Sequence, residues 1–234
     1  MKLLPTILET EENSNHAKRK TAERIIASYS GIIRLYALIR FKIIHVRFLE
    51  EMEQYLPENG LILDLGCGFG LFALYMAISK PNTQIVGLDV NQKRLDIARA
   101  SAEKLGVRNV TFVHQDLRAW RPDQKIAGAY ALDVFHHIPV ESGNQLLCEL
   151  GAHLEPGGAF LLKDIDTGAR GMLAFTFVLD LLMCPRDEFF YRSASVWQQQ
   201  LARAGFAPIY LHYLWDVLPY PHVLLICSKP KREE

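Results

Sequence analysis

The sequence predicts an α/β fold in which a doubly wound, mostly parallel sheet is covered by helices on both faces. Short apolar runs recur along the chain, and the segments between them show the three- and four-residue spacing of amphipathic helices. The apolar runs do not alternate cleanly with polar residues, as is usual for strands buried on both faces. The 234 residues, 50% of them hydrophobic, are enough for one α/β domain with a sizeable core.

The order of the expected elements supports a parallel sheet, because strands and helices alternate along most of the chain. Strands are expected over residues 61–65, 84–88, 110–114, 127–132 and 158–164. Helices are expected over 69–79, 91–105 and 140–152, with Asn91 as an N-cap and Gly106 as a stop for the second of them. An insertion with an apolar helix is expected at about 166–192, followed by a helix over 193–204 and a closing hairpin over 207–215 and 222–228.

Residues 1–57 are expected to form an N-terminal helical extension, or lid, in front of a domain over 58–234. Residues 1–15 are polar and acidic and are expected to be loose. Two helices should follow, near 17–30 and 33–55, with a break at Gly31. Residues 16–47 carry eight Lys or Arg against one Glu, a net charge of 8 − 1 = +7, although the whole chain has a net charge of zero. The positive charge is therefore local to this extension.

A glycine-rich turn at Gly66, Gly68 and Gly70 follows the first expected strand and precedes an apolar, helix-forming segment. Glycine lets the backbone take positive φ and lets a ligand approach where a Cβ would clash. A strand, a glycine turn and a helix N-terminus together predict a site for a small polar ligand. The dinucleotide fingerprint G-x-G-x-x-G fits this turn badly, because its third glycine would fall at Leu71.

With Asp64 two residues before the first glycine, the pattern D-x-G-x-G-x-G resembles motif I of the class I S-adenosylmethionine-dependent methyltransferases. Four further segments resemble that family's other motifs in order and spacing. They cover residues 84–89, 113–117, 131–139 and 154–158. The resemblance covers about residues 58–165 and is to the small-molecule type of the family. It implies a Rossmann-like, doubly wound, mostly parallel seven-stranded sheet with an antiparallel last strand. It also implies S-adenosylmethionine as the cofactor and S-adenosylhomocysteine as the product.

The resemblance implies a set of cofactor-binding residues at the carboxyl ends of the strands, where ligands lie in open α/β sheets. These residues are Asp64, Gly66, Cys67, Gly68, Gly70, Asp89, Val90, Asp116, Leu117 and Asp133. Asp89 would offer two acceptors to the ribose hydroxyls, and Asp116 with Leu117 would contact adenine. Asp133 would face either the methionyl ammonium group or the acceptor substrate. Cys67 is expected to be a small filler in the turn and not a nucleophile.

His136 and His137 are the candidate catalytic residues, because they follow Asp133 into the mouth of the expected site. A histidine suits proton transfer near neutral pH, although substrate contact or loop packing is the alternative role for this pair. Asp164 and Asp166, at the end of strand 158–164, are alternative bases. No metal is expected, because the spacing of these carboxylates does not match that of metal-dependent catechol-type relatives.

The acceptor is expected to be a small, apolar or lipid-like molecule and not nucleic acid. No N-P-P-Y motif follows the fourth strand, no Pro-Cys nucleophile pair is present, and no RNA-binding module is recognisable. The resemblance implies that the apolar helix at about 172–182 and the basic N-terminal helices both flank the expected site. We therefore expect an apolar acceptor and peripheral membrane contact through the N-terminal helices, with packing of those helices on the core as the alternative.

Four widely spaced cysteines and the lack of a signal-peptide pattern predict a cytoplasmic protein. Membrane contact through the N-terminal helices would place it at the inner membrane surface. The identity of the acceptor, the methylated atom and the oligomeric state stay open. Two other functions also stay open. One is a non-catalytic binding or regulatory protein with this fold, and the other is a nucleotide-dependent oxidoreductase.

Overall fold

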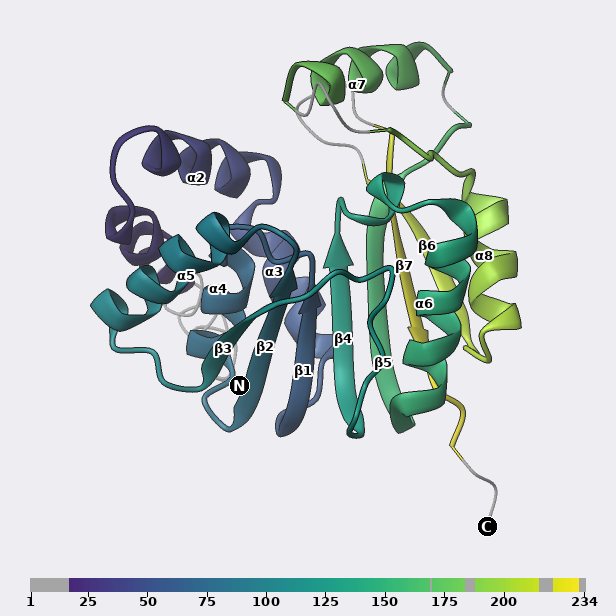
Figure 1. Cartoon of the computed structure of the whole chain (residues 1–234), viewed down its shortest axis with the longest axis horizontal. Helices are drawn as coiled ribbons and strands as arrows, with labels where there is room; N and C mark the ends of the chain where they lie inside the picture. Colours follow the sequence, from purple (N-terminus) through teal and green to yellow (C-terminus); the bar gives the residue numbers. More distant parts are fainter. Residues whose placement is uncertain (1–16, 169, 184–187, 215–220, 232–234) are drawn as a thin grey trace, which may run out of the picture.

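A computed structural model describes residues 17–168, 170–183, 188–214 and 221–231. Its centre is a seven-stranded sheet with the order β3-β2-β1-β4-β5-β7-β6 (Figure 1). The expected loose segment over residues 1–15 lies outside the described residues, as does part of the expected insertion at 184–187.

The sheet confirms the predicted fold class. Its strands are β1 (Gly60–Leu65), β2 (Thr83–Asp89), β3 (Val110–His114), β4 (Ile126–Leu132), β5 (Leu154–Ile165), β6 (Ile209–Leu214) and β7 (His222–Ser228). The first five strands pair in parallel, and β7 runs antiparallel to both of its neighbours, β5 and β6. β5 begins earlier than the predicted residue 158, because Leu154 pairs with Ile126 beyond a register shift in the ladder to β4.

The helices alternate with the strands as predicted. They are α4 (Leu71–Ser79), α5 (Gln92–Leu105), the short 3-10 helix η1 (Phe135–His137), α6 (Val140–His153), α7 (Arg170–Met183) and α8 (Ala194–Arg203). The predicted ends of α5 are confirmed. The Asn91 side chain accepts a hydrogen bond from the backbone N–H of Arg94, and Gly106 takes the left-handed conformation with φ of 71°.

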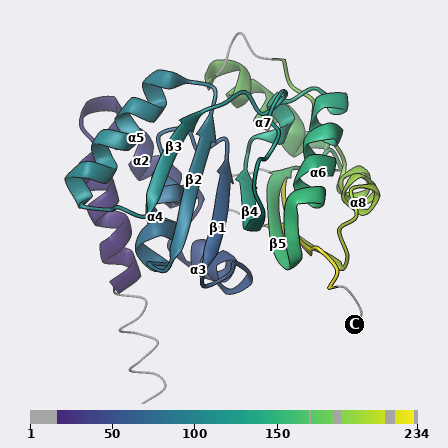
Figure 2. The same cartoon turned by 60° about the horizontal axis from the view of Figure 1, so that its bottom comes forward.

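The sheet has a hydrophobic cluster on each face, as a doubly wound fold requires. Along β7 the side chains alternate, so that Leu224 and Ile226 join one cluster while Val223 and Leu225 join the other. The first cluster contains residues of α4, α5 and the N-terminal helices, and the second contains residues of α6 and α8. Figures 1 and 2 show these two groups of helices on either side of the strands.

The N-terminal extension forms three helices in the described chain, and the predicted single helix over 33–55 is wrong. The helices cover residues 17–28, α2 (Gly31–Ile43) and α3 (Val46–Tyr55). Gly31, with φ of 53°, makes the predicted break before α2. A second break follows at Ile44, which is buried, and His45, whose Nδ1 accepts a hydrogen bond from the N–H of Phe48 and caps α3. The apolar spacing continues across this break, so periodicity alone could not reveal the change of direction.

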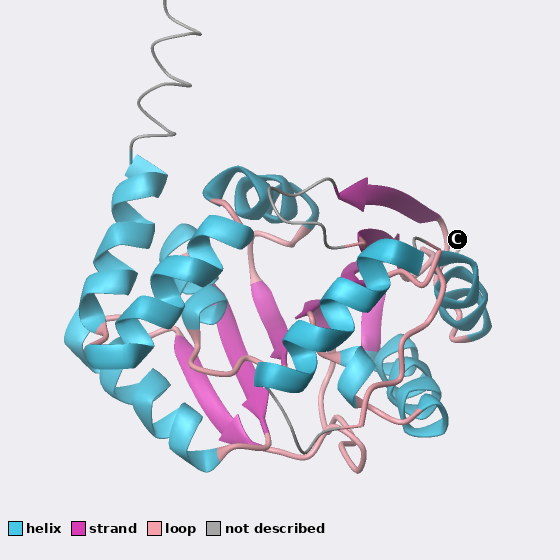
Figure 3. Cartoon of the chain, turned by 90° about the horizontal axis from the view of Figure 1, so that it is seen from above, coloured by secondary structure: helices cyan, strands magenta, loops and turns pink. Residues whose placement is uncertain are grey.

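Two helices lie beyond the carboxyl ends of the parallel strands. In Figure 1, α2 stands above α4 and α5 on the β3–β2 side of this edge, and α7 stands over the end of β5. Seen from above, helices surround the strand ends (Figure 3). In a parallel sheet this edge is where ligands bind, so the fold places α2 and α7 around the expected site.

Candidate cofactor and active site

The glycine turn joins β1 to α4 and takes the left-handed conformation at three positions. Gly66, Gly68 and Gly70 have φ of 74°, 54° and 77°. A Cβ on Gly66 would lie 2.5 Å from Val134, and one on Gly70 would lie 2.7 Å from the Phe112 ring. A Cβ on Gly68 would meet no atom within 4 Å. Packing therefore demands glycine at the first and third positions, whereas Gly68 leaves the backbone open to a ligand.

Asp89, the last residue of β2, is 7% exposed and holds the turn. Its Oδ2 accepts a hydrogen bond from the N–H of Gly68 at 2.8 Å, and its Oδ1 accepts one from the N–H of Asn91 at 2.8 Å. A carboxylate offers about four lone-pair positions, so each oxygen keeps a further position for an incoming hydroxyl. This geometry suits the predicted contact with a ribose diol.

Asp64, in β1, is 3% exposed. The hydroxyl of Tyr130, its partner on the neighbouring strand β4, hydrogen-bonds to its carboxyl group. Burial raises the pKa of Asp64 to about 7, and the charge of Asp89 adds to the rise. A carboxylate offers about four lone-pair positions, so Asp64 keeps acceptor capacity for a cationic ammonium donor beside its contact with Tyr130. The open backbone at Gly68, the acceptors of Asp89 and the oxygen of Asp64 together fit a cofactor with an ammonium group and a ribose.

Alanine at Gly66 and alanine at Gly68 are expected to act differently. Gly66→Ala should destabilise the fold by about 3 kcal/mol, because a clash with Val134 adds to backbone strain of about 1–2 kcal/mol. Gly68→Ala should carry only the backbone strain but weaken S-adenosylhomocysteine binding by about tenfold or more, since its Cβ would enter the ligand space. Thermal unfolding and calorimetric titration of both variants measure these effects. If both variants lost the same stability and Gly68→Ala kept its affinity for S-adenosylhomocysteine, the different roles assigned to the two glycines would be wrong.

The predicted adenine-contacting residues lie at the same sheet edge but have protein partners of their own. Asp116 binds Arg118, whose Nη2 lies 2.6 Å from Oδ2, and this hydrogen bond lowers the pKa of the carboxyl group. Leu117 is buried in the core. Val90 is exposed, and its carbonyl lies 2.8 Å from Nε2 of His114. Their contact with adenine stays a prediction.

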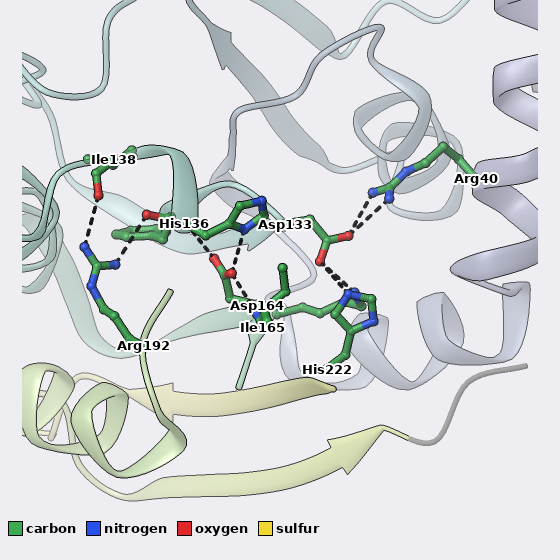
Figure 4. Close-up of polar contacts among 10 residues, drawn as sticks. Arg40, Asp133, His136, Ile138, Asp164, Ile165, Arg192 and His222 are labelled. Atoms are coloured by element: carbon green, nitrogen blue, oxygen red, sulfur yellow. Dashed lines mark hydrogen bonds and ion pairs between the residues drawn. The ribbon is translucent and has the colours of Figure 1, made fainter. Parts of the chain in front are cut away.

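Asp133 follows β4 and lies among three basic side chains (Figure 4). Nζ of Lys163 is 2.7 Å from its Oδ1, and Nε2 of His222 is 3.5 Å from the same oxygen. Nη1 and Nη2 of Arg40, from α2, each lie 3.1 Å from Oδ2. Burial alone would raise the pKa of Asp133, but the charges of Lys163, His222 and Arg40 outweigh it and lower the pKa far below its usual range.

The backbone of Asp133 supports its assignment to a functional site. Its φ is 60°, and it is the non-glycine residue with positive φ in the described chain. Such a conformation costs of order 1–3 kcal/mol and persists where the surroundings impose it. Here the three basic partners hold the side chain. The contact with Arg40 also ties the extension to the sheet edge.

His136 and Asp164 form a buried pair at the same edge (Figure 4). Nδ1 of His136 lies 2.7 Å from Oδ1 of Asp164, and the two side chains are 3% and 0% exposed. Asp164 also accepts the backbone N–H groups of His136 and Ile165. Burial would raise the pKa of Asp164, but the charge and hydrogen bond of His136 reverse the shift, and the net change is downward. Of the two predicted alternative bases, Asp164 therefore contacts the predicted base His136.

Aromatic rings surround the two histidines. His136 lies 4.2 Å from the His137 ring and stacks on Tyr191 at 5.7 Å, and Phe189 lies 5.5 Å from His137. Asp166 accepts the N–H of Ala194 and so caps the start of α8. The second predicted alternative base is thus engaged in positioning a helix.

Sequence reasoning missed Arg40, Lys163 and the aromatic residues after α7. Lys163 carried a usable signal, because it is a lone cation within the apolar run of strand 158–164 and is 1% exposed. Such a residue is seldom buried without a partner. Arg40 carried no such signal, since it is one of eight basic residues between residues 16 and 47.

Cys67 is buried in the turn, and burial raises the pKa of its thiol well above the usual range. A thiolate is therefore disfavoured there, in keeping with a packing role. Within the part of the chain that the structure describes, no group of His, Cys, Asp or Glu side chains is arranged to hold a metal ion. None of the described helices has the length and apolar character needed to cross a membrane.

Comparison with known proteins shows which family the central part of the chain resembles. Residues 62–158 match the family model described as a methyltransferase domain. The ribosomal RNA small subunit methyltransferase G of Shewanella baltica is 32% identical over 118 residues, which cover 44% of this chain and 56% of that protein. The ubiquinone biosynthesis O-methyltransferase of Rickettsia conorii is 24% identical over 183 residues, covering 75% of this chain and 62% of that protein. The chain thus spans about half the length of the first of these curated relatives.

Solved structures share the fold at low sequence identity. The apo form of the S-adenosylmethionine-dependent methyltransferase SibL has a TM-score of 0.67 at 17% identity, covering 88% of this chain and 61% of SibL. The magnesium protoporphyrin IX methyltransferase of Synechocystis PCC 6803, solved with bound SAH, has a TM-score of 0.60 at 20% identity, covering 78% of this chain and 82% of that enzyme. On the fold, the glycine turn and the family-model match, residues 62–158 form the methyltransferase domain of a class I S-adenosylmethionine-dependent methyltransferase, with S-adenosylmethionine as its cofactor.

Proposed function

We propose that the protein transfers the methyl group of S-adenosylmethionine to a small, apolar acceptor and that His136 takes the proton from the acceptor's nucleophilic atom. The observation that carries this proposal is the His136–Asp164 pair at the same sheet edge as the glycine turn. When bound, S-adenosylmethionine supplies an electrophilic methyl group and departs as a neutral thioether. The chain has to hold the nucleophile in line with the methyl carbon and accept its proton.

Asp164 suits His136 to the role of base. When Nδ1–H donates to the carboxylate, the neutral imidazole carries its lone pair on Nε2, which is then the proton acceptor. The lowered pKa of Asp164 keeps this carboxyl group ionised, so its charge stabilises the imidazolium that proton transfer creates. A buried carboxylate orients and stabilises the histidine base of serine hydrolases in the same way.

The apolar character of the acceptor is supported by the surroundings of the histidines. Phe189 and Tyr191 stack on one another at 5.9 Å beside them, and Phe177 of α7 meets Phe189 edge-on at 6.1 Å. Aromatic faces favour flat or apolar ligands. The names of the relatives do not select an acceptor, because they include a ribosomal RNA methyltransferase, an O-methyltransferase of ubiquinone biosynthesis and an N-methyltransferase named for tetrahydroprotoberberine.

A panel of acceptors tests this function. We expect S-adenosylhomocysteine release to rise with the apolar area of the acceptor in a series of phenols of equal acidity, because each buried methylene adds about 0.8 kcal/mol of binding. Polar hydroxy acids and a structured RNA serve as comparison acceptors. Turnover on a polar acceptor or RNA, with none on the apolar series, would contradict the acceptor class. Tight S-adenosylhomocysteine binding without turnover on any acceptor would favour a non-catalytic protein.

A further inference from the structure

α2 exposes an apolar face that the rest of the described chain leaves uncovered. Its four exposed large hydrophobic side chains are Ile32 (79% exposed), Leu35 (56%), Leu38 (49%) and Ile39 (49%). On an α-helix these positions share one side, because each residue advances by about 100°. The opposite side is in the core, where Ala37 and Phe41 are buried. α2 is therefore apolar on both sides, which is unusual for a helix at the surface of a protein.

α7 exposes a second apolar face at the other side of the sheet edge. Phe177, Val178 and Leu181 are 46%, 54% and 45% exposed. Ala174, one turn earlier, is also exposed. The spacing i, i+3, i+4 and i+7 makes a single stripe along the helix. Together α2 and α7 carry seven of the thirteen exposed large hydrophobic side chains in the described chain, four on α2 and three on α7.

The charges on α2 itself have one sign. Arg34 and Lys42 are exposed on the same helix, next to the apolar side chains. From Arg24 to Leu49, both included, the chain has no Asp or Glu and five Lys or Arg. An apolar helix face with interspersed cations is suited to the headgroup region of a membrane that contains anionic lipid, where apolar side chains enter the acyl boundary and cations meet phosphates.

A second copy of the chain is a poorer occupant of this surface. In a two-fold symmetric dimer each patch meets its own copy. Arg34 and Lys42 would then face the same cations across the interface, without an acidic partner on α2. Like charges brought together in an interface are unfavourable. An anionic bilayer satisfies both the apolar side chains and the cations.

We infer that α2 and α7 form a docking surface for an anionic membrane, with the mouth of the cofactor site between them. Both helices lie beyond the carboxyl ends of the strands (Figures 1 and 3). Arg40, on the inner side of α2, holds Asp133 at this edge, so the docking helix and the site are in direct contact. A site that opens onto a bilayer would receive an acceptor dissolved in the membrane. This last step rests on the proposed function, whereas the docking surface does not.

Vesicle co-sedimentation tests the docking surface. We expect the full chain to bind phosphatidylcholine vesicles that contain about 30% phosphatidylglycerol and to bind pure phosphatidylcholine vesicles much more weakly. Arg34→Gln with Lys42→Gln should lower the partition coefficient by roughly thirtyfold, which is the conversion of about 1 kcal/mol for each cation. Ile32→Ser with Leu35→Ser should lower binding to both kinds of vesicle, because the apolar contribution is lost.

The matched control removes two cations elsewhere. Arg108 and Arg203 are exposed and lie near the amino ends of β3 and β6, away from α2 and α7. Arg108→Gln with Arg203→Gln should leave vesicle binding unchanged. Equal losses in the control and in the α2 charge variant would overturn the docking surface in favour of non-specific attraction. The wild type failing to bind anionic vesicles would also overturn it.

Two further readouts separate the remaining outcomes. Calorimetric titration of each variant with S-adenosylhomocysteine tests whether its cofactor site is intact. A variant that binds S-adenosylhomocysteine normally but not the vesicles has lost the docking surface alone. Sedimentation velocity reports the oligomeric state. A dimer that ignores vesicles and is split by Ile32→Ser with Leu35→Ser would assign the α2 face to a second copy and overturn the inference.

Discussion

Replacing His136 by glutamine is expected to lower kcat by about 10²- to 10⁴-fold, the usual contribution of a positioned general base. Glutamine can still hydrogen-bond to Asp164 but cannot take a proton near neutral pH. The affinity for S-adenosylhomocysteine should be unchanged, because the glycine turn and Asp89 belong to other strands. Measured kcat on the best acceptor from the panel, together with calorimetric titration, checks both statements.

Asp164→Asn gives a readout that a purely structural pair would not show. Loss of the carboxylate charge disfavours the protonated imidazole and so lowers the pKa of His136. The acidic limb of the plot of kcat against pH should therefore move to lower pH. A structural role alone would lower the unfolding temperature without moving that limb. His137→Gln is the neighbouring comparison, and we expect a smaller change in kcat because the carboxylate of Asp164 contacts His136. An unchanged kcat in His136→Gln, with a normal fold, would remove this residue from the mechanism.

The Asp164 pair also links stability to pH. The pKa of Asp164 is lowered in the folded protein, so the folded state binds fewer protons than the unfolded state in acid. Its stabilising contribution is therefore complete above the unfolded-state value of about 3.9 and is lost as the pH falls toward the folded-state pKa.

Asp89→Ala is expected to weaken S-adenosylhomocysteine binding by about a hundredfold or more. Hydrogen bonds to a charged group contribute about 1.5–3 kcal/mol each, and the proposed ribose contacts number two. The substitution also leaves the N–H groups of Gly68 and Asn91 without their acceptor, which loosens the turn. Calorimetric titration of wild type and variant measures the difference.

Asp96→Ala is the matched control for the loss of one carboxylate. Asp96 lies on the exposed side of α5, where it pairs with Arg99, and exposed pairs of this kind contribute about 0–1 kcal/mol. Its removal should leave the affinity unchanged. Asp89→Asn should be intermediate, because the amide keeps one acceptor oxygen but loses the charge. Equal affinities of the wild type and Asp89→Ala would contradict the ribose assignment.

The sequence determined those features that depend on local order along the chain. The short apolar runs identified the strands, and Gly66, Gly68 and Gly70 located the turn, because only glycine adopts left-handed backbone there without strain. The family resemblance placed Asp89 at the end of a strand, and it is the last residue of β2. The residues that end parallel strands lie at one edge by topology, so these predictions needed no knowledge of distant packing.

Tertiary structure alone decided which side chains meet across that edge. Arg40 and Asp133 are 93 residues apart in the sequence, and His136 and Asp164 are 28 apart, so no local pattern pairs them. The turn at Ile44 escaped prediction because apolar spacing records which residues are buried and not where the chain changes direction. The exposure of Ile32 and Leu35 escaped it for the same reason, since an apolar side chain on a helix is expected in the core until the fold shows that nothing in the described chain covers it.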